Sequence, residues 1–339
     1  MTRTSQEVRL LNRPIGRPDS STWEITESAI PPLGDGQVLI GVQHVSIDPA
    51  MRGWLNDVRS YVPPVQVGEV MRAQGVGTVL ESRTDDLGVG ESVTGMFGVT
   101  DLAVTDPSTV TRIDTSIADG PTWLGALGMP GMTAYFGLLD VGRLTPGDTV
   151  VVSAAAGAVG SMVGQIAKAH GARTIGIAGG PEKCAWLVDE LGFDAAVDYK
   201  NERVLASLRK LAPEGVDIYF DNVGGETLDA ALANLRRGAR VVVCGAISTY
   251  NETSLPPGPS RYMSLLVFRA SMTGFVVFDY EDRYDEAQRA IATWLEEGAV
   301  SARTHVAEGG VAGFPQALDM LFDGRNTGKL VLEIARRPY

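Results

Sequence analysis

Cysteine, long apolar runs and basic residues are all scarce in this sequence of 339 residues. The two cysteines, Cys184 and Cys244, are too few for a disulfide framework or an all-thiolate metal site, and they indicate a reducing compartment. The longest apolar run, residues 150–159, is about half the length of a membrane span. The polar residues 1–24 do not resemble a secretory signal peptide. We therefore expect a soluble cytoplasmic protein with no membrane partner.

The charge balance is acidic. Lys and Arg total 29 against 41 Asp and Glu, which gives a net charge of −12. Nucleic acids and anionic membranes select basic surfaces, so both are excluded as expected partners.

Residues that bind metal are also few. A catalytic zinc site needs about three protein ligands, and the three histidines, His44, His170 and His305, form no chelating spacing with the cysteines. No Ser-His-Asp motif stands out either. A reduction without a metal depends on a hydride donor and on hydrogen bonds to the developing oxyanion. Conjugated carbonyl compounds suit that chemistry, because hydride transfer to the β-carbon gives an enolate that a few donors can stabilise.

The order of predicted elements indicates two domains. Residues 1–120 contain short strands, at 37–47, 75–81 and 92–97, and predict a β-rich domain. From about residue 127, apolar strands alternate with amphipathic helices, which is typical of a doubly wound parallel sheet. The predicted strands are 149–154, 173–178, 195–198, 216–221 and 240–245, and the helices are 161–169, 227–237 with Gly238 as its stop, and 282–297. A helix at 314–322 and a strand at 329–334 are expected to return to the first domain.

A run of small residues, 155–160, follows the first of the parallel strands and opens a helix. A dinucleotide site needs small residues here, because the backbone turns sharply and the helix N-terminus holds the pyrophosphate. Such runs also occur as simple core packing, and the usual first glycine is alanine in this chain. The strand before the run, the helix after it and a second strand about 20 residues on favour the dinucleotide site.

The end of the second strand points to the kind of dinucleotide. An NAD site places an acidic residue there to bind the ribose 2′-OH, but Gly179 and Gly180 occupy these positions. Lys183 offers a cation for a 2′-phosphate, although it could also be an ordinary surface lysine. The sequence thus predicts NADPH as the cofactor.

The chain resembles the zinc-independent branch of the medium-chain dehydrogenase/reductase superfamily, which contains prostaglandin reductases (leukotriene B4 12-hydroxydehydrogenases), alkenal reductases and curcumin reductases. The segments that carry this resemblance are 47–53 (IDPAMRG), 68–72 (GEVMR), 128–135 (GMPGMTAY), 155–160 (AAGAVG), 220–225 (FDNVGG), 245–251 (GAISTYN) and 326–329 (NTGK). It implies a GroES-like catalytic domain of residues 1–126 and 300–339, a Rossmann NADPH-binding domain of residues 127–299, and a homodimer. The zinc enzymes of the superfamily have Gly-His-Glu where this chain has Gly-Glu-Val at residues 68–70.

The resemblance also implies a set of cofactor contacts. The backbone of Gly157, Ala158, Val159 and Gly160 is expected to hold the pyrophosphate. Lys183 and Tyr199 are expected to bind the 2′-phosphate. The remaining contacts are expected from Asn222, Cys244, Gly245, Ala246, Ile247, Ser248, Thr249, Tyr250, Phe275, Val276, Val277 and Asn326. Of these, residues 275–277 are expected on an apolar strand, and Cys244 and Val276 could equally be core residues.

Tyr250 is the predicted catalytic residue, because a phenol can donate to an enolate and is uncharged at neutral pH. Its other interpretation is packing against the cofactor alone. Tyr61 and Met129 are predicted to line the substrate pocket, and Tyr61 could be a second donor. Relatives often have tyrosine where this chain has Ala50, so the shape of the pocket is open.

We expect an NADPH-dependent reductase of the carbon-carbon double bond in α,β-unsaturated aldehydes and ketones. Quinone reduction with the same cofactor is the alternative enzyme function. A redox sensor that binds NADPH without catalysis is a third hypothesis, for which the sequence offers no interaction motif.

Overall fold

The computed structural model describes residues 3–335 of the chain. The chain forms two compact units, one from residues 1–124 and 304–339 and the other from residues 125–303. We refer to them as unit 1 and unit 2.

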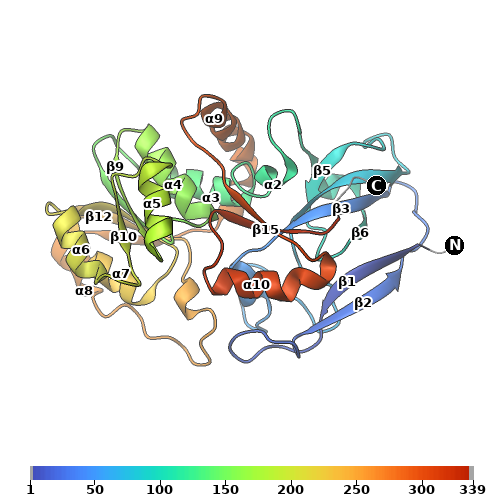
Figure 1. Cartoon of the computed structure of the whole chain (residues 1–339), viewed down its shortest axis with the longest axis horizontal. Helices are drawn as coiled ribbons and strands as arrows, with labels where there is room; N and C mark the ends of the chain where they lie inside the picture. The colour runs from blue at the N-terminus through green and yellow to red at the C-terminus, as the bar shows by residue number, and fades with distance from the viewer. Residues whose placement is uncertain (1–2, 336–339) are drawn as a thin grey trace. The chain divides into compact units, whose positions relative to one another are not determined.

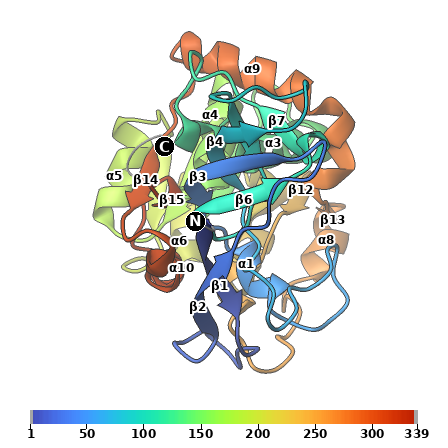
Figure 2. The same ribbon diagram turned by 90° about the vertical axis from the view of Figure 1, so that its right-hand side faces the viewer.

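Unit 1 is built mainly from antiparallel β-structure. Its strands are β1 (Thr4–Leu10), β2 (Trp23–Ala29), β3 (Val38–Ser46), β4 (Gly75–Ser82), β5 (Ser92–Gly95), β6 (Leu102–Thr105), β7 (Val110–Arg112), β14 (Thr304–Ala307) and β15 (Lys329–Glu333). Its helices are α1 (Ala50–Trp54), α2 (Gly120–Trp123) and α10 (Phe314–Phe322), and Pro107–Thr109 and Val311–Gly313 form single 3-10 turns. The larger sheet has the order β14-β15-β3-β4-β5-β7, and β6 also pairs with β3 (Figure 2).

Both ends of the chain contribute to the core of unit 1. β15 pairs antiparallel with β3, so the returning tail becomes part of the same sheet, as the sequence predicts. Trp23 meets Phe314 of α10 edge to face, with ring centroids 5.1 Å apart. Val8, Leu332 and Phe314 are fully buried in one apolar cluster. Segments about 300 residues apart in the sequence therefore share one hydrophobic core.

Unit 2 alternates strands and helices. Its strands are β8 (Thr149–Ser153), β9 (Arg173–Ala178), β10 (Ala195–Asp198), β11 (Val216–Asp221), β12 (Leu235–Val243) and β13 (Ser271–Gly274). Its helices are α3 (Met129–Phe136), α4 (Ala158–Ala169), α5 (Pro181–Asp189), α6 (Val204–Leu211), α7 (Gly225–Leu232), α8 (Met263–Phe268) and α9 (Tyr284–Glu296) (Figure 1). A π-helical turn, Gly137–Val141, continues α3, and 3-10 turns occupy Ile247–Thr249 and Val277–Arg283.

The six strands of unit 2 have the order β10-β9-β8-β11-β12-β13, and every pairing is parallel. This is the order 3-2-1-4-5-6 of a dinucleotide-binding fold, in which ligands bind where the strand order reverses. The reversal falls between β8 and β11. Helices on both faces bury the strands, which explains why β8 is apolar along its centre and why every residue of β11 is buried. The expected fold class, a doubly wound parallel sheet with a β-rich domain, is confirmed.

One predicted element is wrong at its end. Residues 227–237 were expected to form a single helix stopped by Gly238, but α7 ends at Leu232 and β12 begins at Leu235. Gly238 lies inside β12 with φ +80°, near an irregularity in the pairing of β11 and β12. Leu235 is buried, as a helical face would require, yet its backbone pairs with Val216. A tertiary strand pairing overrides the helical periodicity here.

Candidate functional site

The turn after β8 forms the first part of the site. Ala154 adopts φ +48°, a left-handed conformation that is uncommon for alanine. Gly157 is the N-cap of α4, and no side chain caps that helix. The N-terminus of a helix carries unpaired N–H groups and a partial positive charge, so it suits an anion. Ala158, Val159 and Gly160 form the first turn of α4, at the carboxyl end of β8.

Gly160 allows this helix to approach the strand. A Cβ atom on Gly160 would lie 2.4 Å from the Ala154 carbonyl oxygen and 2.8 Å from Ala155 Cα. Ala155, which stands where a glycine is usual, is fully buried. Among the described residues of this turn, Ala154 has the left-handed conformation and Ala155 does not. Alanine in place of the usual glycine at position 155 is therefore compatible with the backbone conformation of the turn. The turn therefore retains the space that a pyrophosphate needs.

A second part of the site lies after β9. Gly179 and Gly180 follow the strand, and Gly180 has φ +101°. A Cβ atom on Gly179 would lie 2.9 Å from Tyr199 Cε1 and 3.0 Å from Lys200 Cε, so both side chains turn back over the end of β9. Lys183 is half-buried in the first turn of α5. Tyr199 is about half exposed.

Lys200 brings a second cation to this place. Burial lowers the pKa of Lys183, and the neighbouring Lys200 ammonium lowers it further. Asp198 stabilises the backbone near both lysines, because its Oδ1 accepts hydrogen bonds from the N–H groups of Gly180 at 2.8 Å and Lys200 at 3.0 Å. These bonds, led by the one from Gly180, keep the pKa of Asp198 below its usual range. Two lysines side by side at the end of the second strand suit a doubly charged phosphate.

Lys200 is not among the residues predicted from the sequence to bind the cofactor. Its position could have indicated this role, because Lys200 directly follows Tyr199 just beyond the third predicted strand, 195–198. In a parallel sheet the carboxyl ends of neighbouring strands lie at the same edge. The distance between Lys183 and Lys200 in the sequence hides this proximity.

The third part of the site follows β11. Asn222 Nδ2 donates to the Ser153 carbonyl at 2.7 Å, and Asn222 N–H donates to Ser153 Oγ at 2.8 Å. Asn222 thereby bridges the ends of β11 and β8, at the point where the strand order reverses. Its carbonyl accepts the N–H of Ile247 at 3.2 Å.

The loop after β12 contains the remaining predicted residues of this group. Cys244, Gly245 and Ala246 follow the strand, and Ile247–Thr249 form a 3-10 turn. The predicted strand 240–245 is therefore too long, since β12 ends at Val243. Ser248 Oγ donates to the Val223 carbonyl at 2.6 Å, which ties the loop to the segment after β11.

Tyr250 ends this loop. Its Oη accepts a hydrogen bond from Ala246 N–H at 3.2 Å. A Cβ atom on Gly245 would lie 2.9 Å from the same Oη, so the phenol rests directly on the loop backbone. Asn251, the next residue, has a buried Oδ1 without a hydrogen-bond partner among the described residues.

Residues 275–277 do not form a strand. β13 ends at Gly274, and Val277 begins a 3-10 turn for which Val276 is the N-cap. Phe275 packs edge to face against Phe220 at 6.4 Å, and its Cζ lies 2.5 Å from where a Gly137 Cβ would be. The ring of Phe275 thus packs against the end of α3, where Gly137 has no side chain and leaves room for it.

Both cysteines are free thiols. Burial raises the pKa of Cys244 to about 12, with a smaller contribution from the Asp221 carboxylate. Burial also raises the pKa of Cys184 to about 11. A thiol with a raised pKa carries little thiolate at neutral pH and is a poor nucleophile.

The predicted residues Tyr61 and Asn326 belong to unit 1, and Met129 belongs to unit 2. Tyr61 is more than half exposed, whereas Asn326 is buried and its Nδ2 donates to the Gly328 carbonyl at 2.9 Å. Met129 is the first residue of α3, and its carbonyl accepts Thr133 Oγ at 2.7 Å. Ala50 begins α1.

A buried ion pair connects two sequence motifs within unit 1. Lys329 Nζ lies 2.7 Å from Asp48 Oδ1 and also donates to the Ile47 carbonyl at 3.1 Å. Lys329 is 3% exposed. Segments 47–53 and 326–329 are therefore neighbours in space, and the pair orients the start of α1.

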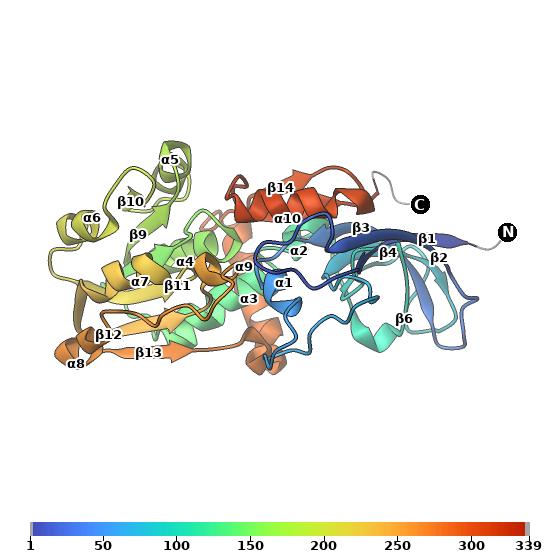
Figure 3. The ribbon, with the colours of Figure 1, turned by 90° about the horizontal axis from the view of Figure 1, so that it is seen from below.

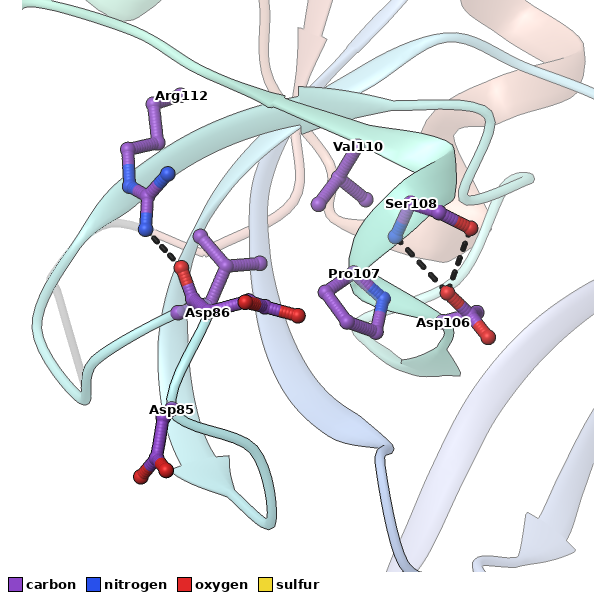
Figure 4. Close-up of a pocket in the computed structure, with 8 residues that line it drawn as sticks. Asp85, Asp86, Asp106, Pro107, Ser108, Val110 and Arg112 are labelled. Carbon is purple, nitrogen blue, oxygen red and sulfur yellow. Dashed lines mark hydrogen bonds between the residues drawn. The ribbon is translucent and has the colours of Figure 1, made fainter.

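A surface pocket of about 560 Å³ lies elsewhere in unit 1 (Figure 4). Its walls come from the turn after β4 and from the segment between β6 and β7, and three of its carboxylates are Asp85, Asp86 and Asp106. Asp106 Oδ1 accepts hydrogen bonds from Ser108 N–H and Oγ, which lower the pKa of this carboxyl. Arg112 donates to the Asp86 carbonyl. These contacts stabilise turns, and the pocket contains none of the predicted site residues.

Metal-binding clusters and membrane-spanning helices are both absent from the described residues. Among residues 3–335, no group of three or more His, Cys, Asp and Glu side chains is arranged to hold a metal ion. In the same part of the chain, no helix combines the length and apolar character needed to cross a bilayer. Independence from metal stays a prediction.

The fold and the site of unit 2 define a class, a dinucleotide-binding oxidoreductase fold combined with a β-rich unit. Residues 6–113 match the family described as the N-terminal domain of oxidoreductase, and residues 158–293 match the one described as zinc-binding dehydrogenase. The NADPH-dependent curcumin reductase of Escherichia coli (strain K12) is 40% identical over 332 residues, 96% of each chain. The 2-alkenal reductase (NADP(+)-dependent) of Nicotiana tabacum is 39% identical over 339 residues, 98% of each chain.

Solved structures agree with this relationship. CurA from Vibrio vulnificus in complex with NADPH has 42% identity and a TM-score of 0.93, covering 98% of this chain and 100% of that one. The quinone oxidoreductase of Escherichia coli, at 18% identity and a TM-score of 0.77, shares the fold alone. The chain belongs to the medium-chain dehydrogenase/reductase superfamily, in the branch of prostaglandin, curcumin and alkenal reductases.

Proposed function

We propose that this protein is an NADPH-dependent reductase of the carbon-carbon double bond in α,β-unsaturated aldehydes and ketones. The relatives of known name that it matches over nearly their whole length act on curcumin and 2-alkenals with NADPH. The observation that carries the proposal is the site at the carboxyl edge of the unit 2 sheet. An uncapped helix N-terminus and a pair of lysines lie there at the ends of β8, β9 and β10.

The residues present fit NADPH. Gly157, Ala158, Val159 and Gly160 would hold the pyrophosphate, since the space at Gly160 is kept open and α4 has no side-chain cap. Lys183, Tyr199 and Lys200 would hold the 2′-phosphate. The absence of an acidic side chain at positions 179 and 180 removes a repulsion that would otherwise exclude that group.

The remaining contacts come from the loops after β11 and β12. We assign Asn222, residues 244–250 and residues 275–277 to the nicotinamide half of the cofactor, and the contact expected from Asn326 stays a prediction. The buried Oδ1 of Asn251 lacks a partner among the described residues, which supports a ligand at this loop. Unit 2, which spans residues 125–303, would be the NADPH-binding domain predicted at residues 127–299, and unit 1 would be the catalytic domain.

The chemistry follows from the position of Tyr250. NADPH, when bound, would supply a hydride for the β-carbon of the substrate. Tyr250 would give its proton to the α-carbon of the resulting enolate, and its phenolate would take up a proton from solvent. Ala246 N–H donates to Tyr250 Oη, so it stabilises the phenolate more than the phenol and assists this transfer. The roles of Tyr61 and Met129 in the substrate pocket stay predictions.

The reaction is tested by mixing the purified protein with NADPH and either a 2-alkenal or 1,4-benzoquinone. We expect loss of NADPH absorbance with the alkenal and a saturated aldehyde as the product. Dialysis against EDTA should leave the rate unchanged. Faster turnover of the quinone would favour quinone reduction, and tight NADPH binding without turnover of any enone would favour the sensor hypothesis.

The role of Tyr250 is tested by Tyr250→Phe. We expect kcat to fall by about 10²-fold, since general acid catalysis typically contributes this much. The Kd for NADPH should change far less, because Phe keeps the aromatic ring in the loop that we assign to the cofactor. Tyr262→Phe is the control, because Tyr262 lies 60% exposed in the same unit. An unchanged kcat in Tyr250→Phe would exclude the phenol as the proton donor and leave solvent in that role.

We also propose a homodimer in the cytoplasm. Two free thiols suit a reducing compartment. β13 is the end strand of the unit 2 sheet, and α8 lies next to it (Figure 3). Met263, Leu266 and Val267 of α8 and Met272 of β13 are all exposed apolar residues. An open strand edge beside an apolar helix favours association, and a second copy related by a two-fold axis would cover both.

A further inference from the structure

Asp221 is a buried carboxylate to which the proposed chemistry gives no role. It is the last residue of β11, at the reversal of strand order, and it is 1% exposed. No Lys, Arg or His within residues 3–335 forms an ion pair with it. A buried carboxylate without a counter-ion must be stabilised by hydrogen bonds.

Four donors converge on one oxygen of this carboxylate. Oδ1 accepts hydrogen bonds from Tyr219 Oη at 2.9 Å, Ser153 Oγ at 3.2 Å, Val223 N–H at 3.1 Å and Gly224 N–H at 3.0 Å. Burial raises the pKa of Asp221, and all four of these hydrogen bonds oppose that shift. The two backbone donors lie at the N-terminus of α7, where a negative charge is favoured.

The backbone of Asp221 binds a further loop. Its carbonyl accepts the N–H groups of Cys244 at 2.9 Å and Gly245 at 3.0 Å. One residue therefore connects the end of β8, the turn into α7 and the loop after β12. These segments carry Asn222 and Tyr250.

We propose that Asp221 is a positioning residue for NADPH reduction of the substrate, acting through Asn222 and the loop of residues 244–250. The inference depends on the proposed function for its meaning in catalysis. The ionised carboxylate holds Val223 and Gly224, which places Asn222 against Ser153, while the Asp221 carbonyl sets the path of the Tyr250 loop. Tyr219 and Ser153 supply side-chain donors that keep the carboxylate in one orientation.

β11 offers a matched control. Asp217 is also a buried aspartate of this strand, 9% exposed, and its Oδ2 accepts Thr149 N–H at 2.9 Å and lies 3.4 Å from Arg236 Nη1. It sits near the amino end of the strand, away from the predicted cofactor contacts. Asp221→Asn and Asp217→Asn thus make the same chemical change at two ends of one strand.

The test measures the Kd for NADPH by fluorescence titration without substrate, then kcat and KM for a 2-alkenal, and finally unfolding by urea. We expect Asp221→Asn to raise the Kd and lower kcat by about tenfold each, because the four hydrogen bonds then end on a neutral amide oxygen instead of a carboxylate. Asp217→Asn should change the Kd for NADPH and kcat by less than about twofold, although it lowers the free energy of unfolding about as much as Asp221→Asn does. Equal effects of the two variants, or an Asp221 variant that loses stability alone, would overturn the inference.

Tyr219→Phe covers the case in which Asp221→Asn does not fold. It removes one of the four donors and leaves the carboxylate, so we expect a smaller rise in the Kd, about threefold, and an intermediate kcat. An unchanged Kd and kcat in a folded Tyr219→Phe protein would contradict the inference. A wild-type protein that binds NADPH but reduces no alkenal would contradict the proposed function alone, and the Kd values would still decide the role of Asp221.

Discussion

At the scale of single residues, Gly160 occupies a position without room for a methyl group. The nearest obstacle is a backbone carbonyl, that of Ala154, which cannot rotate away as a side chain would. The missing side chain at this point allows α4 to begin close to the end of β8. The packing of the helix and the proposed binding of a pyrophosphate thus depend on the same atom-sized space.

Gly160→Ala should therefore affect both properties. We expect a loss of about 1–3 kcal/mol in the free energy of unfolding, as for other overpacked sites, together with weaker NADPH binding. Urea unfolding and fluorescence titration measure the two effects. Gly53→Ala in α1 is the control, since its Cβ would meet nothing within 4 Å, and alanine should stabilise it by about 0.5–1 kcal/mol. A Gly160→Ala protein as stable as wild type would show that the turn can relax.

His44 contributes to the pH dependence of stability near neutral pH. It lies on β3 opposite Glu333, and its Nδ1 is buried without a partner among the described residues. Burial lowers the pKa of His44 from the model-compound value of 6.5, although Glu333 and Asp119 oppose the shift. The unfolded chain therefore binds a proton more readily than the folded one, and stability falls as pH falls below about 6.5.

Replacement of His44 by Gln should reduce this pH dependence. Between about pH 7.5 and 5 the free energy of unfolding should fall less steeply in His44→Gln than in wild type, because one proton-binding difference is removed. Above about pH 7.5 the two curves should run parallel. Urea unfolding at several pH values measures the slopes. Identical slopes below pH about 6.5 would mean that the imidazole keeps an ordinary affinity for protons in the folded protein.

At the scale of elements, α4 meets the segment after α5 through a glycine and a phenylalanine. A Cβ atom on Gly164 would lie 1.8 Å from Phe193 Cζ, and Phe193 is 3% exposed. The ring fills the space that the glycine leaves. Because α4 begins at the pyrophosphate turn, this contact also sets where the helix N-terminus lies.

A double-mutant cycle tests this contact. Gly164→Ala should destabilise by about 1–3 kcal/mol through overpacking, and Phe193→Ala by about 3–5 kcal/mol through a cavity. In the double variant the new methyl group has room, so the combined loss should be smaller than the sum. Urea unfolding of the four proteins gives the coupling free energy. Additive losses would show that the backbone of α4 shifts away from the ring.

The elements of unit 2 were predictable where they depend on local pattern. β8, β9, β10 and β11 are short, mainly apolar segments between turns, and the structure contains them at the expected places. The end of α7 was not predictable, because Leu235 continues the helical periodicity and yet pairs in a parallel strand. The apolar segment 275–277 was likewise predicted to be a strand, but the strand β13 ends before it, at Gly274. Pairing with a distant strand decides both cases.

At the scale of the whole molecule, association is the property to test. The charge of −12 on each chain opposes contact between copies, so a dimer needs an apolar surface such as the one around α8 and β13. Leu266 is 70% exposed there.

Leu266→Glu should convert the proposed dimer into a monomer. A charged side chain at the centre of an apolar contact is costly to bury, and symmetry places it in the interface twice. Analytical ultracentrifugation measures the mass in solution, and Val188→Glu on α5 is the control, because Val188 is an exposed apolar residue at another part of the unit. A wild-type protein that is monomeric at micromolar concentration would contradict the dimer.

The site shows the same division between local and distant information as the fold. The turn at residues 155–160, the two glycines after β9 and Lys183 are consecutive features of one strand-helix-strand stretch, so their chemistry was readable before the chain was folded. Lys200 joins Lys183 only because β10 lies beside β9. The cofactor class was thus predictable, while the full set of charges that we propose for the 2′-phosphate was not.

The amino-acid order alone was enough to specify the parallel strands and the small-residue turn, because each is encoded within about 30 neighbouring residues. The scarcity of metal ligands follows from composition. Folding in three dimensions decided that the tail adds β15 to β3, that Asp221 gathers donors from separate segments, and that Lys183 has a second lysine beside it. Such contacts join residues far apart in the chain, and their energy depends on burial and on distance, neither of which a linear pattern contains.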